Sequence, residues 1–247
     1  MTMSNPTPIA PGLTPDDIRA VAPVLAKYTK ERITEAMWSR PGLKRRDRAL
    51  TTVTALIVRG QVIGVPNYVK KALDNGVTPA EISELVVQVA FYAGWGHAFA
   101  AIPAIKNIFA ERGVSSDQLP SADATASADT APAQSAEAEF ELQACMPVCA
   151  GVLEITDELL HGEVWQRPGL NPRDRSLITV AALIASGQHA LLPAYLRRAV
   201  AHGITKEQLS EQLTHLAFYS GWPLVLGAAG SVAGFFDGLP QSGGAED

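Results

Sequence analysis

The sequence predicts an all-α protein made of two tandem copies of one helical unit. Residues 38–109 match residues 165–236 without gaps at a constant offset of 127 residues, which indicates an internal duplication. Each copy contains apolar stretches bounded by the residues that start and stop helices. Almost no segment shows the alternating pattern typical of strands. We therefore expect two helical domains related by duplication.

The chain has room for two domains and a linker in its 247 residues. We place the first domain at residues 12–113 and the second at residues 140–240. Residues 114–139 between them are rich in Ala, Ser, Asp, Pro and Glu and offer little apolar surface to bury. This composition is typical of a flexible linker.

Helix signals follow one another along the second copy. Asn171, followed by Pro172, predicts the start of a first core helix that ends at Gly187. Pro193 and Gly203 bound the next helix. Residues 177–185 of the first core helix are continuously apolar apart from one Thr, so this helix is expected to be covered on nearly every side. Pairing between units would provide that cover.

A capping box predicts the third helix of each copy, since a Thr is followed three residues later by Glu or Gln. The two pairs are Thr78 with Glu81 and Thr205 with Gln208. A last helix follows a Gly-Trp step in each copy, at Trp95 and at Trp222. The sequence thus predicts the same order of helices twice.

Composition narrows the function classes. The net charge is −5 and the basic residues are scattered, so no nucleic-acid partner is expected. No apolar run is long enough to cross a bilayer, and the first residues do not resemble a secretory signal, so we expect a cytoplasmic protein. Cys145 and Cys149 are interpreted as small apolar side chains of one helix. The histidines lack the spacing of metal ligands, so no metal is expected.

Two long segments of the second copy carry a family resemblance. They read GEVWQRPGLNPRDRSLITVAALIASG at residues 162–187 and AVAHGITKEQLSEQLTHLAFYSGWP at residues 199–223. Together they resemble the carboxymuconolactone decarboxylase family. The resemblance implies an all-α fold like that of the alkylhydroperoxidase relatives, rings of small subunits, and cofactor-independent decarboxylation of a lactone acid. If the ring has six units, three tandem chains would form it as a homotrimer.

The peroxidase relatives use a CxxC pair with an upstream Glu and a downstream His. This sequence contains no CxxC, and it has Ala49 or Ser176 at the Glu position and Tyr68 or Tyr195 at the His position. We therefore exclude thiol peroxidase activity. The same tyrosines depart from the decarboxylase branch, where a His is usual, which indicates that a phenol polarises a carbonyl there.

His215 is the strongest catalytic candidate, because the first copy has Gln88 at the matching position. We expect His215 to transfer a proton while Tyr195 and Arg167 hold the substrate. A histidine that only forms a hydrogen bond between helices is the alternative. Glu163 is a candidate general base that the first copy replaces with Ala, and a solvated surface Glu is the alternative reading.

Further candidates are expected to bind a small-molecule substrate. Arginines at matching places, such as Arg167 and Arg175, could hold a carboxylate or brace a turn beside an Asp. Aromatic residues could line an apolar pocket or pack against the last helix. His97 occurs only in the first copy and could serve a separate site. The full set is Arg40, Arg48, Arg167, Arg175, Tyr68, Tyr219, Trp95, Trp222 and His97.

Three functions remain open from the sequence. The first is a cofactor-independent lyase that decarboxylates a lactone acid or a β-keto acid. The second is a tailoring enzyme that isomerises, cyclises or dehydrates an aromatic or polyketide-like compound. The third is a non-catalytic ring protein that binds a ligand, which the change from His215 to Gln88 favours for the first copy.

Overall fold

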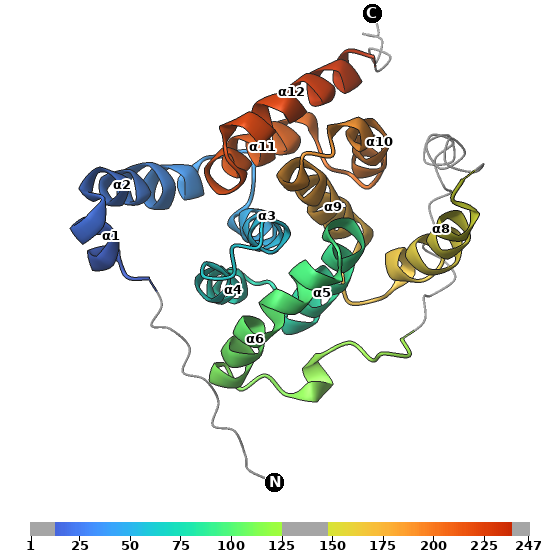
Figure 1. Ribbon diagram of the computed structural model, residues 1–247, viewed down its shortest axis with the longest axis horizontal. Helices are drawn as coiled ribbons and strands as arrows, with labels where there is room; N and C mark the ends of the chain where they lie inside the picture. Colours follow the sequence, from blue (N-terminus) through green and yellow to red (C-terminus); the bar gives the residue numbers. More distant parts are fainter. Residues whose placement is uncertain (1–12, 125–147, 239–247) are drawn as a thin grey trace, which may run out of the picture. The chain divides into compact units, whose positions relative to one another are not determined.

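The computed structural model describes residues 13–124 and 148–238 (Figure 1). It contains two compact units, one ending at Arg40 and the other beginning at Pro41. The first unit consists of α1 (Pro15–Val21), α2 (Pro23–Tyr28), a π-helical segment (Thr29–Ala36) and a 3₁₀ turn (Met37–Ser39). Every regular element in the described ranges is helical, so the all-α prediction is confirmed.

The second unit contains four longer helices from each copy of the repeat. The first copy contributes α3 (Arg45–Val58), α4 (Val65–Asp74), α5 (Pro79–Ala93) and α6 (Trp95–Glu111). The second copy contributes α9 (Pro172–Ser186), α10 (Leu192–Ala201), α11 (Lys206–Ser220) and α12 (Trp222–Asp237). Shorter elements are a 3₁₀ turn (Ser116–Gln118), α8 (Ala150–Ile155), a π-helical segment (Thr156–His161), and 3₁₀ turns at Val164–Gln166 and His189–Leu191.

The local helix signals are confirmed where the structure describes them. The side chain of Asn171 accepts a hydrogen bond from the backbone N–H of Asp174, and α9 ends at Gly187 in the left-handed conformation. Thr78 and Thr205 both form the predicted capping boxes. Each signal acts within one helical turn, which explains why the sequence alone reveals it.

The core is centred on α3 and α9, which make the most extensive contact between helices of the second unit and lie at its centre in Figure 1. All side chains of residues 177–185 are buried, as predicted for a helix covered on every side. Burial of this kind contributes roughly 1.5–3 kcal/mol for each large apolar side chain. This helix pair therefore forms the rigid base on which the polar residues described below are held.

The later helices cross between the two copies. Helix α5 of the first copy packs more extensively on α9 than on α3, whereas α11 of the second copy packs more extensively on α3 than on α9. Side chains that project from the α3–α11 contact therefore come from both copies, and so do those at the α5–α9 contact. Any site at either contact is composite.

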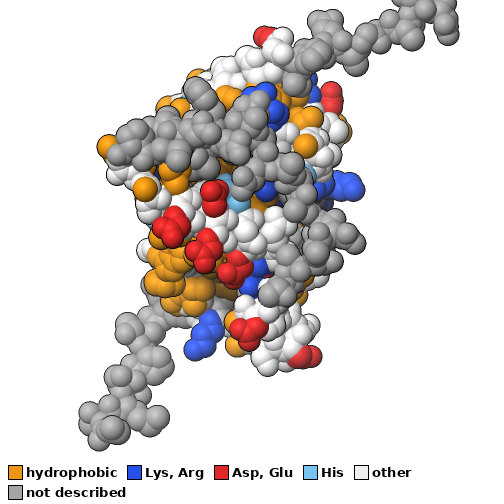
Figure 2. Space-filling view, turned by 90° about the vertical axis from the view of Figure 1, so that its right-hand side faces the viewer, with side chains coloured by type: hydrophobic (Ala, Val, Ile, Leu, Met, Phe, Trp, Pro, Cys, Tyr) orange, Lys and Arg blue, Asp and Glu red, His pale blue; other side chains and the backbone are white. Residues whose placement is uncertain are grey.

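Both copies contribute to one compact unit from Pro41 onward. The domain boundaries at 12–113 and 140–240 and the homotrimer stay predictions. Residues 125–139 of the predicted linker and Cys145 lie outside the described residues, and Cys149 directly precedes α8. No helix in the described ranges is both long and apolar enough to span a membrane. On the face in Figure 2, the visible lysines and arginines of the described residues form several separate patches.

Candidate functional site

Two polar clusters lie at matching places on either side of the α3–α9 pair. The histidine cluster consists of Arg48, Thr52, Tyr68, Glu211, His215 and Tyr219. The glutamine cluster consists of Glu84, Gln88, Tyr92, Arg175, Thr179 and Tyr195. Each member of one cluster corresponds to a member of the other at the offset of 127 residues. The two clusters are therefore products of the duplication.

The hydrogen bonds around His215 define which ring nitrogen carries its proton. Its Nε2 atom lies 2.7 Å from the hydroxyl oxygen of Thr52, and His215 is completely buried. The hydroxyl of Thr52 donates its single hydrogen to the carbonyl oxygen of Arg48, 2.8 Å away. Because that hydrogen is used, Nε2–H must be the donor toward Thr52. We assign the neutral tautomer whose Nδ1 atom carries the lone pair.

The surroundings of His215 keep its imidazole neutral. Burial, together with the positive charges of Arg48 and Lys71, lowers the pKa of His215 to about 3, although Glu211 acts in the opposite direction. At neutral pH the ring is therefore an uncharged acceptor and donor. An anion that entered this region would oppose the effect of the two cations and raise the pKa of His215.

A pair of tyrosines lies beside the histidine. The phenolic oxygens of Tyr68 and Tyr219 are 3.0 Å apart, and the rings meet edge to face. The ring of Tyr219 also lies against that of His215, with 4.8 Å between centroids. Burial raises the pKa of Tyr68, so its phenol keeps its proton. The ammonium nitrogen of Lys71 lies 6.0 Å from the centre of the Tyr68 ring, which brings a cation to the same place.

Arg48 and Glu211 support the cluster. Arg48 is completely buried and donates to the carboxylate of Glu211 at 3.0 Å. It also approaches the carbonyl oxygen of Pro41 at 3.4 Å, which ties α3 to the Pro-Gly-Leu turn. Gly42 in that turn has a φ of +87°, and an added Cβ would lie 2.7 Å from Cγ of Glu211. The turn can therefore approach Glu211 only with glycine at this position.

The glutamine cluster repeats this arrangement without a titrating group at its centre. Gln88 donates through Nε2 to the hydroxyl of Thr179 at 3.1 Å, and Thr179 donates to the carbonyl oxygen of Arg175 at 2.8 Å. The amide oxygen of Gln88 accepts a hydrogen bond from Arg175 at 3.0 Å. The amide thus preserves the hydrogen bond that Nε2–H of His215 makes, but it cannot transfer a proton near neutral pH.

Glu84 of the glutamine cluster is held by two arginines. Arg175 donates to it at 2.7 Å and Arg167 at 3.0 Å, and the Glu84 side chain is almost fully buried. Arg167 also donates to the carbonyl oxygens of Ser121 and Ala122. The carboxylate that these arginines bind in the structure is therefore a side chain of the protein.

Aromatic residues and a further cation complete this cluster. The phenol of Tyr92 donates to that of Tyr195 at 3.2 Å and accepts from the indole N–H of Trp165 at 2.9 Å. Burial raises the pKa of Tyr92 well above its usual value. The guanidinium carbon of Arg198 lies 3.7 Å from the centre of the Trp165 ring. Arg198 corresponds to Lys71 in the duplication.

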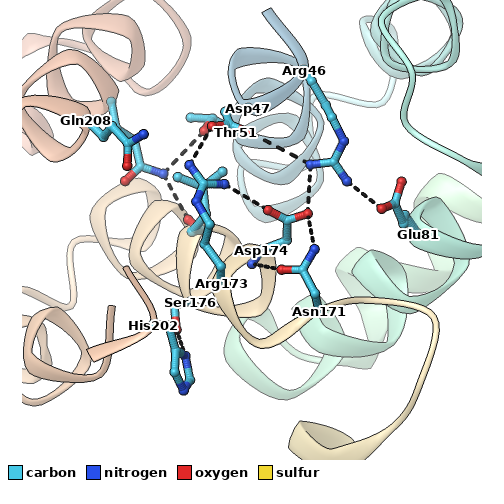
Figure 3. A network of polar contacts seen from close by, with 12 residues as sticks. Arg46, Asp47, Thr51, Glu81, Asn171, Arg173, Asp174, Ser176, His202 and Gln208 are labelled. Carbon is cyan, nitrogen blue, oxygen red and sulfur yellow. Dashed lines mark hydrogen bonds and ion pairs between the residues drawn. The ribbon is translucent and has the colours of Figure 1, made fainter. Parts of the chain in front are cut away.

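A reciprocal ionic network joins the two copies between the clusters (Figure 3). Arg46 on α3 donates to Asp174 on α9 at 2.7 Å, and Arg173 on α9 donates to Asp47 on α3 at the same distance. Arg46 also pairs with Glu81 on α5. Both aspartates are almost fully buried. Each copy thus supplies the arginine that neutralises the buried aspartate of the other.

Neither of the two cavities below is lined by a member of either cluster, although Gly169, which lines the first, lies against Glu84. One of about 280 Å³ borders the Pro168–Gly169 turn, next to Pro120 and Ser121. Another of about 530 Å³ is formed by residues of the first unit only. Within the described ranges, no three His, Cys, Asp or Glu side chains gather in a way that could hold a metal ion. The clusters remain the main concentrations of buried polar chemistry.

A model of the carboxymuconolactone decarboxylase family matches residues 23–107 and 150–233, which together make up more than half of the chain. The chain belongs to the carboxymuconolactone decarboxylase family. The two matched segments correspond to the two copies of the duplication, so this membership applies to each copy. The resemblance noted from the sequence is thereby confirmed.

Two curated relatives are similar over shorter stretches. The 4-carboxymuconolactone decarboxylase of Acinetobacter baylyi is 45% identical over 62 residues, covering 25% of this chain and 46% of that protein. The nitrosuccinic acid decarboxylase of Metarhizium robertsii is 37% identical over 70 residues, covering 28% of this chain and 49% of that protein. The chain thus matches about half the length of these curated relatives.

A solved structure from Burkholderia xenovorans LB400, described as a gamma-carboxymuconolactone decarboxylase subunit, aligns with 91% of this chain and 96% of that chain. The sequence identity is 21% and the TM-score 0.45. This similarity is too distant to add to the argument about the site.

The structure groups the predicted residues of this family member differently from the sequence-based expectation. His215 was expected to act with Tyr195 and Arg167, but it lies with Tyr68 and Arg48 of the other copy. Tyr195 and Arg167 belong to the surroundings of Gln88. The reason is the crossing of α5 and α11, which no local signal in the sequence reveals.

Several other candidates lie outside the histidine cluster. Glu163 is exposed and lies two residues before Trp165, beside the glutamine cluster, which favours the reading as a solvated side chain. Trp95 and Trp222 are about half exposed and pack edge-on against Phe91 and Phe218. These positions differ from the expected lining of an enclosed pocket.

Two candidates occupy other surroundings. His97 is exposed, and its Nδ1 atom lies 3.2 Å from the carbonyl oxygen of Ile57. Arg40 is exposed at the end of the first unit, and its role stays a prediction.

Sequence reasoning missed Thr52, Lys71 and Glu211, together with their counterparts in the other cluster. The sequence contains a pattern that could have identified one of them, Glu211. Glu211, His215 and Tyr219 are spaced by four residues, which places them on one face of α11. Thr52 and Lys71 lie on other helices of the other copy, so only the tertiary structure brings them to His215.

Proposed function

We propose that this protein is a decarboxylase, and that its reaction takes place at the histidine cluster. The reaction removes CO₂ from a small carboxylic acid that carries a carbonyl or nitro group next to the carbon losing CO₂ or joined to it through a C=C bond. Membership of the family and the decarboxylase names of both curated relatives support the reaction class. We choose this site because it contains His215, whose imidazole is buried, neutral and held in one tautomer by its hydrogen bonds.

The substrate class follows from the names of those relatives. Both 4-carboxymuconolactone and nitrosuccinic acid are acids with more than one carboxyl group. In each, an electron-withdrawing group can accept the electron pair that is left when CO₂ departs. We infer that the substrate here is likewise a small polycarboxylic acid, with Lys71 as the cation that attracts a carboxylate that is retained in the product.

The steps balance without any added redox agent. The carbon–carbon bond to the carboxylate breaks, CO₂ leaves, and the electron pair stays on the carbon. It delocalises onto the carbonyl or nitro oxygen, through the C=C bond where one lies between them. The phenols of Tyr68 and Tyr219 donate hydrogen bonds to that oxygen. When the anionic substrate binds and raises the pKa of His215, the ring takes up a proton from solvent. The imidazolium then delivers this proton to the carbon and returns to the neutral ring.

The test compares the full-length protein with H215Q in a mass-resolved assay on γ-carboxymuconolactone, without added metal or cofactor. We expect the wild type to form a product lighter by one CO₂. We expect turnover by H215Q to fall about 100-fold or more, because general acid–base catalysis contributes 10²–10⁴-fold. H189Q is the matched control, since it makes the same substitution at a histidine outside both clusters.

Two results would contradict the proposal. Equal turnover by H215Q and the wild type would remove His215 from the reaction. A product of unchanged mass would instead identify an isomerase or cyclase, which is the tailoring function left open by the sequence.

A further inference from the structure

The glutamine cluster has kept the construction of the histidine cluster apart from its central side chain. Its Thr179 bonds back to α9 as Thr52 does to α3, and its tyrosine pair has the same edge-to-face geometry, with 5.5 Å between ring centroids. Only Gln88 changes the chemistry, because an amide does not titrate near neutral pH. The glutamine cluster has thus kept the polar framework of the histidine cluster without its titrating group.

Arg198 is the feature of the glutamine cluster that remains unexplained. It is half-buried, its guanidinium lies over Trp165, and one of its nitrogens is 3.4 Å from Nδ1 of His161. No carboxylate among the described residues lies within 4.0 Å of it, whereas Arg167 and Arg175 both pair with Glu84. Removing a guanidinium from water without a counter-charge costs free energy, which an anionic ligand would offset.

The groups around Arg198 do not neutralise its charge. Burial and the charge of Arg198 lower the pKa values of His161 and His202, so both rings are neutral at pH 7. Asp157 acts in the opposite direction on the pKa of His161, and the backbone of Pro172 does so on that of His202. Tyr92 keeps its proton because burial raises its pKa. A cation is therefore left among neutral hydrogen-bonding groups.

The geometry also suits one class of ligand. A guanidinium binds a carboxylate through two parallel hydrogen bonds. The rings of Trp165 and Tyr195 lie nearly parallel, 25° apart, and Trp165 is almost fully buried beside Arg198 and Tyr195. Arg198 and Tyr195 are both partly exposed, so a ligand on Arg198 would be reached from solvent.

We propose that the glutamine cluster is a second binding site, which holds a small carboxylic acid on Arg198 without converting it. Gln88 stands where the proton-transferring His215 stands in the other cluster, so an acid bound there is retained unchanged. The site goes beyond the proposed function, although the choice of small acids as ligands rests on it. The chain would then carry one converting site and one holding site.

The test uses the full-length H215Q chain, which isolates binding from turnover. Its tryptophan indole N–H signals are followed by NMR, with Trp165 assigned from a W165F variant, during titration with succinate and with γ-carboxymuconolactone. We expect the Trp165 signal to shift and saturate. R198M should weaken the apparent affinity at least about tenfold, and R198K, which keeps the charge but loses the two-pronged geometry, at least about threefold.

K71M, the matching change in the other copy, is the control and should leave the Trp165 titration unchanged. Sodium chloride at the same ionic strength should not reproduce the shift. The inference is overturned if the Trp165 signal does not move, if chloride moves it equally, or if R198K binds as its parent does. If R198M does not fold, the affinity of R198K still tests the inference, because R198K keeps the positive charge. A chain that binds both acids but releases no CO₂ would contradict the proposed function and leave this inference standing.

Discussion

At the scale of single residues, the environment of His215 affects the stability of the fold as well as the proposed reaction. The folded protein holds the pKa of His215 at about 3, whereas the ordinary value is 6.5. Between these pH values the unfolded chain binds a proton that the folded chain does not. The stability contributed by neutral His215 is therefore fully present above pH 6.5 and is lost as the pH falls toward 3.

We predict that H215Q has a flatter dependence of unfolding free energy on pH. Between pH 6.5 and 4 the wild-type value should fall more steeply, by about 1 kcal/mol per pH unit. Chemical denaturation at a series of pH values measures this difference. S210A changes an exposed residue of the same helix and removes no titrating group, so it is the control and its curve should run parallel to that of the wild type. Parallel curves for H215Q and the wild type would show that His215 is not held neutral.

Gly42 offers a second prediction at this scale. G42A adds a methyl group 2.7 Å from Cγ of Glu211, at a φ of +87°. The control G76A has nearly the same φ, +85°, but nothing within 4 Å of the added carbon. The backbone alone costs each variant about 1 kcal/mol, and G42A should lose at least about 1 kcal/mol more by overpacking. Equal losses in thermal unfolding would show that the turn does not press on Glu211.

At the scale of helices, the ionic network between α3 and α9 fixes how the two copies meet. Asp174 accepts from Arg46 and from Arg173, so D174N leaves two partly buried arginines with less compensating charge. We expect D174N to lower the unfolding free energy by about 2 kcal/mol. This loss is smaller than that for a fully buried ion pair, because both arginine side chains are about a quarter exposed. Chemical denaturation measures it.

The control for that variant is D16N, which breaks an exposed ion pair between Asp16 and Arg19. Such pairs contribute little, so D16N should unfold at the wild-type denaturant concentration. If D174N were as stable as D16N, the network would not determine the meeting of α3 and α9.

The sequence predicted the helices well because their signals are local. The capping residues Asn171, Thr78 and Thr205 act within one turn, and the apolar run of α9 directly indicates burial. The pairing of helices was not predictable in this way. Since α3 and α9 carry nearly the same residues, α11 could have packed on either, and no local signal distinguishes the two. The partners of His215 were therefore assigned to the wrong copy.

At the scale of the whole molecule, the crossing makes each cluster depend on both copies. One half of the chain supplies Thr52 and Tyr68, and the other half supplies His215 and Tyr219. The asymmetry between the copies, seen in the sequence as His215 against Gln88, becomes an asymmetry between two sites of the same construction. In the proposed function, duplication allowed one site to keep proton transfer while the other changed.

The double exchange Q88H/H215Q tests this account most directly. It moves the imidazole to the glutamine cluster, where Thr179 can accept the hydrogen bond from Nε2–H as Thr52 does. With γ-carboxymuconolactone, CO₂ release by the folded double variant should exceed that of H215Q at least about tenfold, because the general acid–base contribution is partly restored. A folded double variant that releases CO₂ no faster than H215Q would contradict the claim that one side chain separates the two sites.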